Sequence, residues 1–70
     1  MGDLVSPLPG LVATVHVSVG DVVSAGDPVV TLQSMKMEIP VGAEESGTVE
    51  AILVEEGVEI DTGAPLVRIS

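Results

Sequence analysis

Hydrophobic and polar positions alternate most regularly along residues 11–19. Valine occupies positions 15, 17 and 19, and the polar residues His16 and Ser18 stand between them. A period of two residues is typical of a β-strand with one buried and one exposed face. The pattern therefore predicts a strand over residues 11–19, with its valines facing a core.

The same order of residues returns when the sequence is shifted by 37 positions, and no gap is needed from Pro9 to the C-terminus. The identical pairs are Gly10 and Gly47, Val12 and Val49, Val17 and Val54, Gly20 and Gly57, Gly26 and Gly63, Pro28 and Pro65, and Val30 and Val67. A fixed internal period marks a repeated structural unit. Since there are only two copies, the repeat indicates one domain with quasi-twofold symmetry.

One residue in each copy departs from the alternation. Val12 is out of phase with the valines that follow it, and Val49 is out of phase with its own neighbours in the same way. An extra residue in a strand shifts the phase of its side chains. We therefore predict a bulge or sharp bend near residues 13–14 and again near residues 50–51.

The remaining apolar runs predict short strands. The expected strands cover residues 3–6, 11–19, 22–23, 29–33, 38–41, 48–54, 58–60 and 66–69. Glycine and proline in the gaps leave little room for a helix, and 14 valines and 4 isoleucines favour pleated strands. With no helix to cover a sheet, two sheets must cover each other. We predict an all-β fold, a flattened β-barrel or sandwich of two four-stranded antiparallel sheets, with residues 1–70 forming a single domain.

Composition removes several classes of function. The net charge is −9 and the chain has neither aromatic residues nor cysteine. Nucleic-acid binding needs basic groups and stacking rings, so we exclude it. Disulfides and thiolate metal sites are also excluded. No apolar run reaches the length of about 20 residues that a membrane span needs, and the N-terminus shows no signal-peptide pattern. We expect a cytoplasmic, monomeric domain that does not contact membranes.

The candidate chemistry centres on one amine. Lys36 is the only lysine, and it stands at the junction of the two repeats within residues 33–38. The repeat axis relates this junction to the chain termini, so we expect Lys36 at one end of the domain and both termini at the other. A tight turn at Met35 and Lys36 should join two neighbouring strands, with positive φ at both residues. A lysine ammonium must lose its proton before it attacks anything, and an external enzyme would have to assist. The alternative is an ordinary solvated lysine.

The other polar candidates have simpler explanations. Met35 and Met37, two residues apart, would share one face of an extended segment, where they either fill gaps in the packing or form a recognition element. His16 lacks nearby partners for catalysis. The acidic pairs lack the spacing of a calcium loop, so we predict no metal site. Arg68 should pair with an acid or shield an edge strand.

Residues 35–37, Met-Lys-Met, together with the Gly-Asp-x-Val-x-x-Gly-Asp stretch at 20–27 and the Gly-Thr-Val at 47–49, resemble the biotinyl/lipoyl attachment family. The resemblance covers nearly the whole chain and implies a barrel-sandwich hybrid. It implies that biotin protein ligase joins biotin to Lys36, with Met35 and Met37 recognised by the ligase. The biotin arm would then carry a carboxyl group from a biotin carboxylase to a carboxyltransferase, and the domain itself would catalyse nothing.

The sequence departs from this family in two places. Gln33-Ser34 replaces the Glu-Ala or Glu-Ser common before the motif, which should matter little. The gapless repeat leaves no room for the thumb found in the acetyl-CoA carboxylase carrier of bacteria. Two alternatives remain. Lipoyl domains usually show Asp-Lys-Ala where this chain has Met-Lys-Met, so a lipoyl carrier is one alternative, and an unmodified β-domain that serves as an interaction module is the other.

Overall fold

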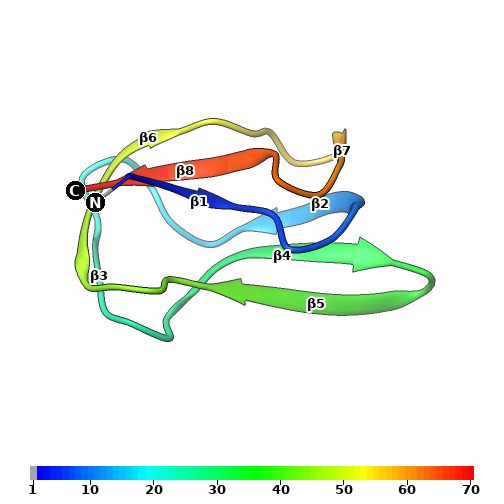
Figure 1. Cartoon of the computed structure of the whole chain (residues 1–70), viewed down its shortest axis with the longest axis horizontal. Helices are drawn as coiled ribbons and strands as arrows, with labels where there is room; N and C mark the ends of the chain where they lie inside the picture. Colours follow the sequence, from blue (N-terminus) through cyan, green and yellow to red (C-terminus); the bar gives the residue numbers. More distant parts are fainter. Residues whose placement is uncertain (1) are drawn as a thin grey trace.

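The computed structural model describes residues 2–70, and within them every regular element is a β-strand (Figure 1). The strands are β1 Gly2–Val5, β2 Gly10–Val15, β3 Val22–Val23, β4 Pro28–Ser34, β5 Met37–Gly42, β6 Gly47–Ile52, β7 Glu59–Ile60 and β8 Pro65–Ile69. The molecule is elongated, measuring 30 × 18 × 18 Å. The described part of the chain holds no helix with the length and apolar character to cross a membrane. The predicted all-β fold is confirmed.

The eight strands form two antiparallel sheets, ordered β1-β8-β6-β3 and β5-β4-β2-β7. A shift of 37 residues carries β2 onto β6, β3 onto β7, β4 onto β8 and β1 onto β5. The shift therefore exchanges the two sheets, and each sheet takes two strands from each repeat. Neither repeat forms a complete sheet by itself, so the two halves of the chain interlock.

The symmetry extends to individual hydrogen bonds between backbone atoms. The Gly20 N–H donates to the Val49 carbonyl at 2.8 Å, and the Gly57 N–H donates to the Val12 carbonyl at 2.7 Å. Gly20 and Gly57 have φ of 97° and 92°, a left-handed conformation that glycine adopts without the steric penalty of a side chain. The matched glycines therefore mark the two crossings where the chain passes from one sheet to the other.

Both predicted bulges are present. The register of β2 against β4 shifts between Val12 and Thr14, and that of β6 against β8 shifts between Val49 and Ala51. Because each bulge adds one residue, Val12 and Val49 are turned into the core and are completely or almost completely buried.

The first long strand is shorter than predicted. β2 ends at Val15, and Val19 is 63% exposed instead of facing the core. The His16 N–H still bonds to the Val29 carbonyl, but the chain then leaves the sheet and crosses to β3 in the other sheet. The alternation of valines past Val15 therefore reflects a crossing segment, of which only Val17 packs against the core.

The core lies between the sheets and is aliphatic. Its buried hydrophobic residues are Leu4, Val12, Val23, Val29, Val30, Leu32, Val41, Ala43, Val49, Leu66, Val67 and Ile69. Burying a valine or leucine side chain contributes about 1.5–3 kcal/mol relative to leaving it in water. These residues hold β4 and β8 at the centre, with the β4–β5 turn projecting at one end and the termini at the other (Figure 1). The predicted placement of the turn and the termini is thus confirmed.

Candidate functional site

The turn between β4 and β5 contains two residues, Met35 and Lys36. Ser34 on β4 pairs with Met37 on β5, so the ladder of paired residues continues to the base of the turn. Met35 has φ of 51° and Lys36 has φ of 67°. Positive φ at both central positions is the mark of a type I′ hairpin, whose twist matches that of the strands it joins. The predicted tight turn is confirmed.

This backbone conformation is unfavourable for the residues that adopt it. A left-handed conformation costs a residue with a side chain about 1–2 kcal/mol, and glycine or asparagine would lower that cost. The strands must therefore impose it. β4 is anchored by Val30 and Leu32, which are fully buried, and β5 is anchored by Val41. The result is a tight hairpin whose strands stay paired up to its two-residue tip.

Gly10 on β2 supports the hairpin from the neighbouring strand. A methyl group added at Gly10 would lie 2.9 Å from the backbone carbonyl oxygen of Gln33, closer than such atoms approach. The absence of a side chain thus lets β2 approach β4 just before the turn. The repeat pairs Gly10 with Gly47, and this pairing is the only signal in the sequence for their structural role.

The side chains at the tip point away from the fold. Lys36 is exposed, Met35 is 92% exposed and Met37 is 64% exposed. Within the described residues Lys36 makes no hydrogen bond and no ion pair. The gap-filling explanation for the two methionines is wrong, because neither packs into the core. The alternation argument also fails here, since Met35 and Lys36 occupy a left-handed turn and not an extended segment.

The remaining candidate residues are not part of this site. His16 contacts Thr31 on β4, with 2.6 Å between Nε2 and Oγ1, so its role is to join the crossing segment to the sheet. Arg68 on β8 pairs with Asp3 on the edge strand β1, with Nε 3.1 Å from Oδ1, as predicted. Residues 2–70 contain no group of three or more histidine or acidic side chains that could hold a metal ion. Lys36 is therefore a solitary group.

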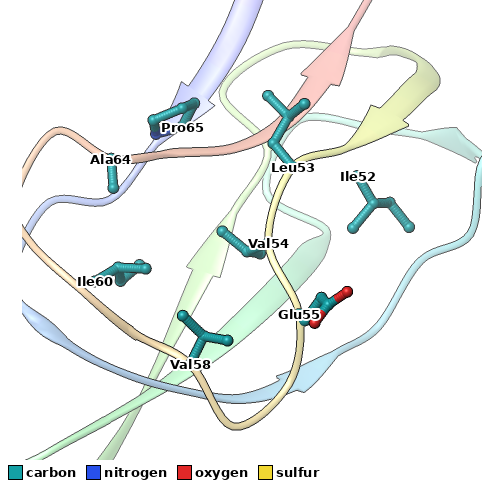
Figure 2. A pocket seen from close by; sticks show the side chains of 8 residues that line it. All are labelled: Ile52, Leu53, Val54, Glu55, Val58, Ile60, Ala64 and Pro65. Atoms are coloured by element: carbon teal, nitrogen blue, oxygen red, sulfur yellow. The ribbon is translucent and has the colours of Figure 1, made fainter.

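The structure also shows a hollow that no pattern in the sequence indicated (Figure 2). It has a volume of about 470 Å³ and lies on the second repeat. It is lined by Ile52, Leu53, Val54, Glu55, Val58, Ile60, Ala64 and Pro65. In the first repeat Leu53, Val58 and Ala64 correspond to His16, Asp21 and Asp27, so this apolar surface has no symmetric counterpart. With only one ionisable side chain in its lining, the hollow offers no chemistry comparable to Lys36.

Comparison with protein families gives one match over almost the whole chain. The biotin/lipoyl family, described as "Biotin-requiring enzyme", matches residues 2–69. The chain is 42% identical over 65 residues to a biotin carboxyl carrier protein of Streptococcus mutans, covering 93% of this chain and 50% of the relative. It is 43% identical over 56 residues to a biotin/lipoyl attachment protein of Bacillus subtilis, covering 80% of this chain and 77% of the relative.

Longer relatives share the same segment. The alpha3 subunit of a biotin-dependent acyl-coenzyme A carboxylase from Mycobacterium leprae is 44% identical over 69 residues, which are 97% of this chain and 12% of the subunit. Among solved structures, a single-chain, multi-domain long-chain acyl-CoA carboxylase matches with a TM-score of 0.92 and 31% identity, over 97% of this chain and 7% of the other. Urea carboxylase of Kluyveromyces lactis matches with a TM-score of 0.91 and 37% identity, over 97% of this chain and 6% of the enzyme. The chain thus spans half or less of the length of the carrier protein and the carboxylases.

Proposed function

Because this chain belongs to the biotin/lipoyl attachment family, we propose that biotin is attached to the Nζ atom of Lys36. The chain is a biotin carrier domain, similar to the carrier protein of Streptococcus mutans and to segments of several carboxylases. One observation supports the attachment point more than any other. The only lysine of the chain occupies the tip of a tight, exposed hairpin, and the described residues leave its amine without a partner.

The site fits an amide-linked group. The Lys36 amine loses a proton and attacks the activated carboxyl carbon of biotin, so that a C–N bond forms and the activating group leaves with its electron pair. Amide formation removes the positive charge of the side chain, and no acid on the described chain depends on that charge for an ion pair. When bound, the ureido ring of biotin supplies the nitrogen that takes up and releases a carboxyl group.

The contribution of the chain is positional. β4 and β5 hold the turn, and the lysine side chain projects from it into solvent. Because the hairpin lies at the end of the molecule away from the termini, the arm extends away from the point where further chain would be attached (Figure 1). We infer that biotin protein ligase, a biotin carboxylase and a carboxyltransferase act on this arm in turn, and that this domain is a carrier without catalytic activity.

Intact mass after co-expression tests the proposal. We expect the chain to gain the mass of one amide-linked biotin with biotin protein ligase, and no lipoyl group with a lipoyl ligase. Lipoyl addition without biotin addition would replace the proposal with the lipoyl alternative. An unchanged mass with both ligases would leave an unmodified interaction module.

Substitution of the lysine locates the site. Lys36→Arg should abolish biotin attachment, because the guanidinium does not lose its proton in proteins and the α-amine is then the only amine left. The free energy of unfolding should change by less than about 0.5 kcal/mol, since the side chain is exposed. A streptavidin blot measures the labelling and a denaturant titration the stability. Residual labelling would assign the attachment to the α-amine.

A further inference from the structure

The side chains of the two methionines beside Lys36 lie outside the hydrophobic core. Met35 is 92% exposed and Met37 is 64% exposed. Apolar side chains that stay this exposed gain little of the free energy that burial provides. Met35 adds a cost of its own, because its φ of 51° is a conformation that glycine or asparagine adopts more easily. Both side chains are therefore accessible to a protein that engages the hairpin.

The same exposure makes these thioethers reactive. The chain contains no cysteine, and its third methionine, Met1, lies outside the described residues. Oxidation of sulfur follows its accessibility to the oxidant, and a methionine that is oxidised to the sulfoxide becomes polar and chiral. Within residues 2–70, the accessible sulfur is therefore concentrated on the two sides of Lys36.

We propose that Met35 and Met37 are an oxidisable pair whose conversion to sulfoxides prevents biotin protein ligase from modifying Lys36. The proposal rests on the attachment of biotin at Lys36. In each step a peroxide gives one oxygen atom to the thioether, its O–O bond breaks, and hydrogen peroxide leaves as water. The sulfur loses two electrons and the peroxide gains them. A dithiol-dependent methionine sulfoxide reductase reverses the step.

The oxidation acts on recognition and not on folding. A ligase surface that fits two thioethers would have to bury an S=O group without a hydrogen-bond partner, which is unfavourable. The core beneath the hairpin contains Leu32 and Val30 and no methionine, so the fold has no contact to lose. Oxidised chains should consequently stay folded while their lysine is no longer labelled.

The test compares three preparations of the unmodified chain: untreated, oxidised with hydrogen peroxide, and oxidised then treated with methionine sulfoxide reductases and dithiothreitol. Catalase removes the peroxide before the ligase is added, so that the ligase itself is not oxidised. Intact mass counts the added oxygen atoms, and peptide mapping locates them. We expect oxidation at residues 35 and 37 to lower the single-turnover labelling rate by about tenfold or more, the factor that one buried, unpaired polar group produces. The circular dichroism spectrum should be unchanged, and reductase treatment should restore the rate.

The matched control is the double variant Met35→Leu/Met37→Leu, which keeps the apolar volume and removes both sulfur atoms. Its treated and untreated preparations are compared with each other, and their labelling rates should be equal. Two results would overturn this inference and leave the proposed function intact. One is that peroxide slows the labelling of the variant as much as that of the wild-type chain. The other is that a wild-type chain oxidised at both residues is labelled at the normal rate. Failure of the untreated wild-type chain to take up biotin would remove the proposed function and this inference together.

Discussion

The two ends of the molecule carry equivalent strand pairs, β4–β5 at one end and β1–β8 at the other. Only β4 and β5 are joined by a turn, so we call that end closed and the other end open. At the closed end, Leu32 pairs with Ile39, Thr31 with Pro40 and Val30 with Val41. At the open end the equivalent residues pair in the same register, namely Ile69 with Gly2, Arg68 with Asp3 and Val67 with Leu4. The irregularity at the inner end of each ladder is also shared, since it falls at Pro28 in one and at Pro65 in the other.

This comparison separates folding from function. The β1–β8 ladder forms without any turn to connect its strands, so the fold does not depend on a turn at that position. The turn at the closed end can therefore adopt a left-handed conformation with large side chains, because it is not what specifies the register. The two basic residues are divided in the same way. Arg68 is paired with Asp3 in the open ladder, whereas Lys36 stands unpaired at the closed tip.

Exchanging which end is closed should have the largest effect on labelling. A circular permutant would open the chain between Lys36 and Met37 and would join Ser70 to Met1 with a four-residue linker. At the closed end, residues 34–37 connect Gln33 to Glu38, which are the repeat equivalents of Ser70 and Met1, so a linker of four residues has the same length. The permutant should keep its β-type circular dichroism spectrum, while its labelling rate falls by about a hundredfold or more because the lysine is no longer held in a turn. An unfolded permutant would show that the turn is needed for the fold after all.

Moving the lysine by one residue along the closed hairpin should lower the labelling rate by at most about a hundredfold. The variants are Met35→Lys with Lys36→Met, and Lys36→Met with Met37→Lys. Position 35 is the other corner of the turn and position 37 belongs to β5, so the amine leaves the turn at a different angle in each. Misplacement of a reacting atom by about 1 Å can cost roughly a hundredfold in rate. Single-turnover labelling rates for lysine at positions 35, 36 and 37 test whether the turn positions the amine. Equal rates at the three positions would show that it does not.

Two equivalent glycines test whether support for the hairpin is local. A methyl at Gly10 would lie 2.9 Å from the Gln33 carbonyl oxygen, and a methyl at Gly47 would lie 2.5 Å from that of Ser70. Overpacking of this kind costs about 1–3 kcal/mol, so both Gly10→Ala and Gly47→Ala should lower the denaturation midpoint. Only Gly10→Ala should also slow the labelling of Lys36, because Gln33, which it would displace, lies on β4 just before the turn. Equal labelling of the two folded variants would contradict this account.

The open ladder should be the least sensitive to change. Arg68 and Asp3 are both partly exposed, and ion pairs in such settings contribute about 0–1 kcal/mol. Arg68→Gln should therefore shift the free energy of unfolding by less than about 1 kcal/mol and leave the labelling rate unchanged. Urea titrations at low and at high salt measure the first effect. A large loss of labelling would mean that the two ends are coupled through the core.

The internal repeat explains how much the sequence could predict. Because the same break in alternation occurs at Val12 and at Val49, both bulges could be predicted. The junction between the two repeats likewise predicted the turn that carries Lys36. The end of β2 at Val15 could not be predicted, since it depends on where the chain crosses between sheets. The sequence left the exposure of Met35 and Met37 undecided for a similar reason. Whether an apolar side chain at a hairpin tip is covered depends on neighbouring segments, and this hairpin projects beyond them.

Since each sheet draws two strands from each repeat, half of this chain could not complete either sheet alone. Two separate copies of the repeat could complete both sheets only as a twofold-symmetric dimer with exchanged strands, and each ladder would then be open at its end. Joining the two copies into one polypeptide requires one connecting segment, and in this chain that segment is residues 34–37. Lys36 therefore lies in the one segment that makes the single chain differ from that hypothetical symmetric dimer.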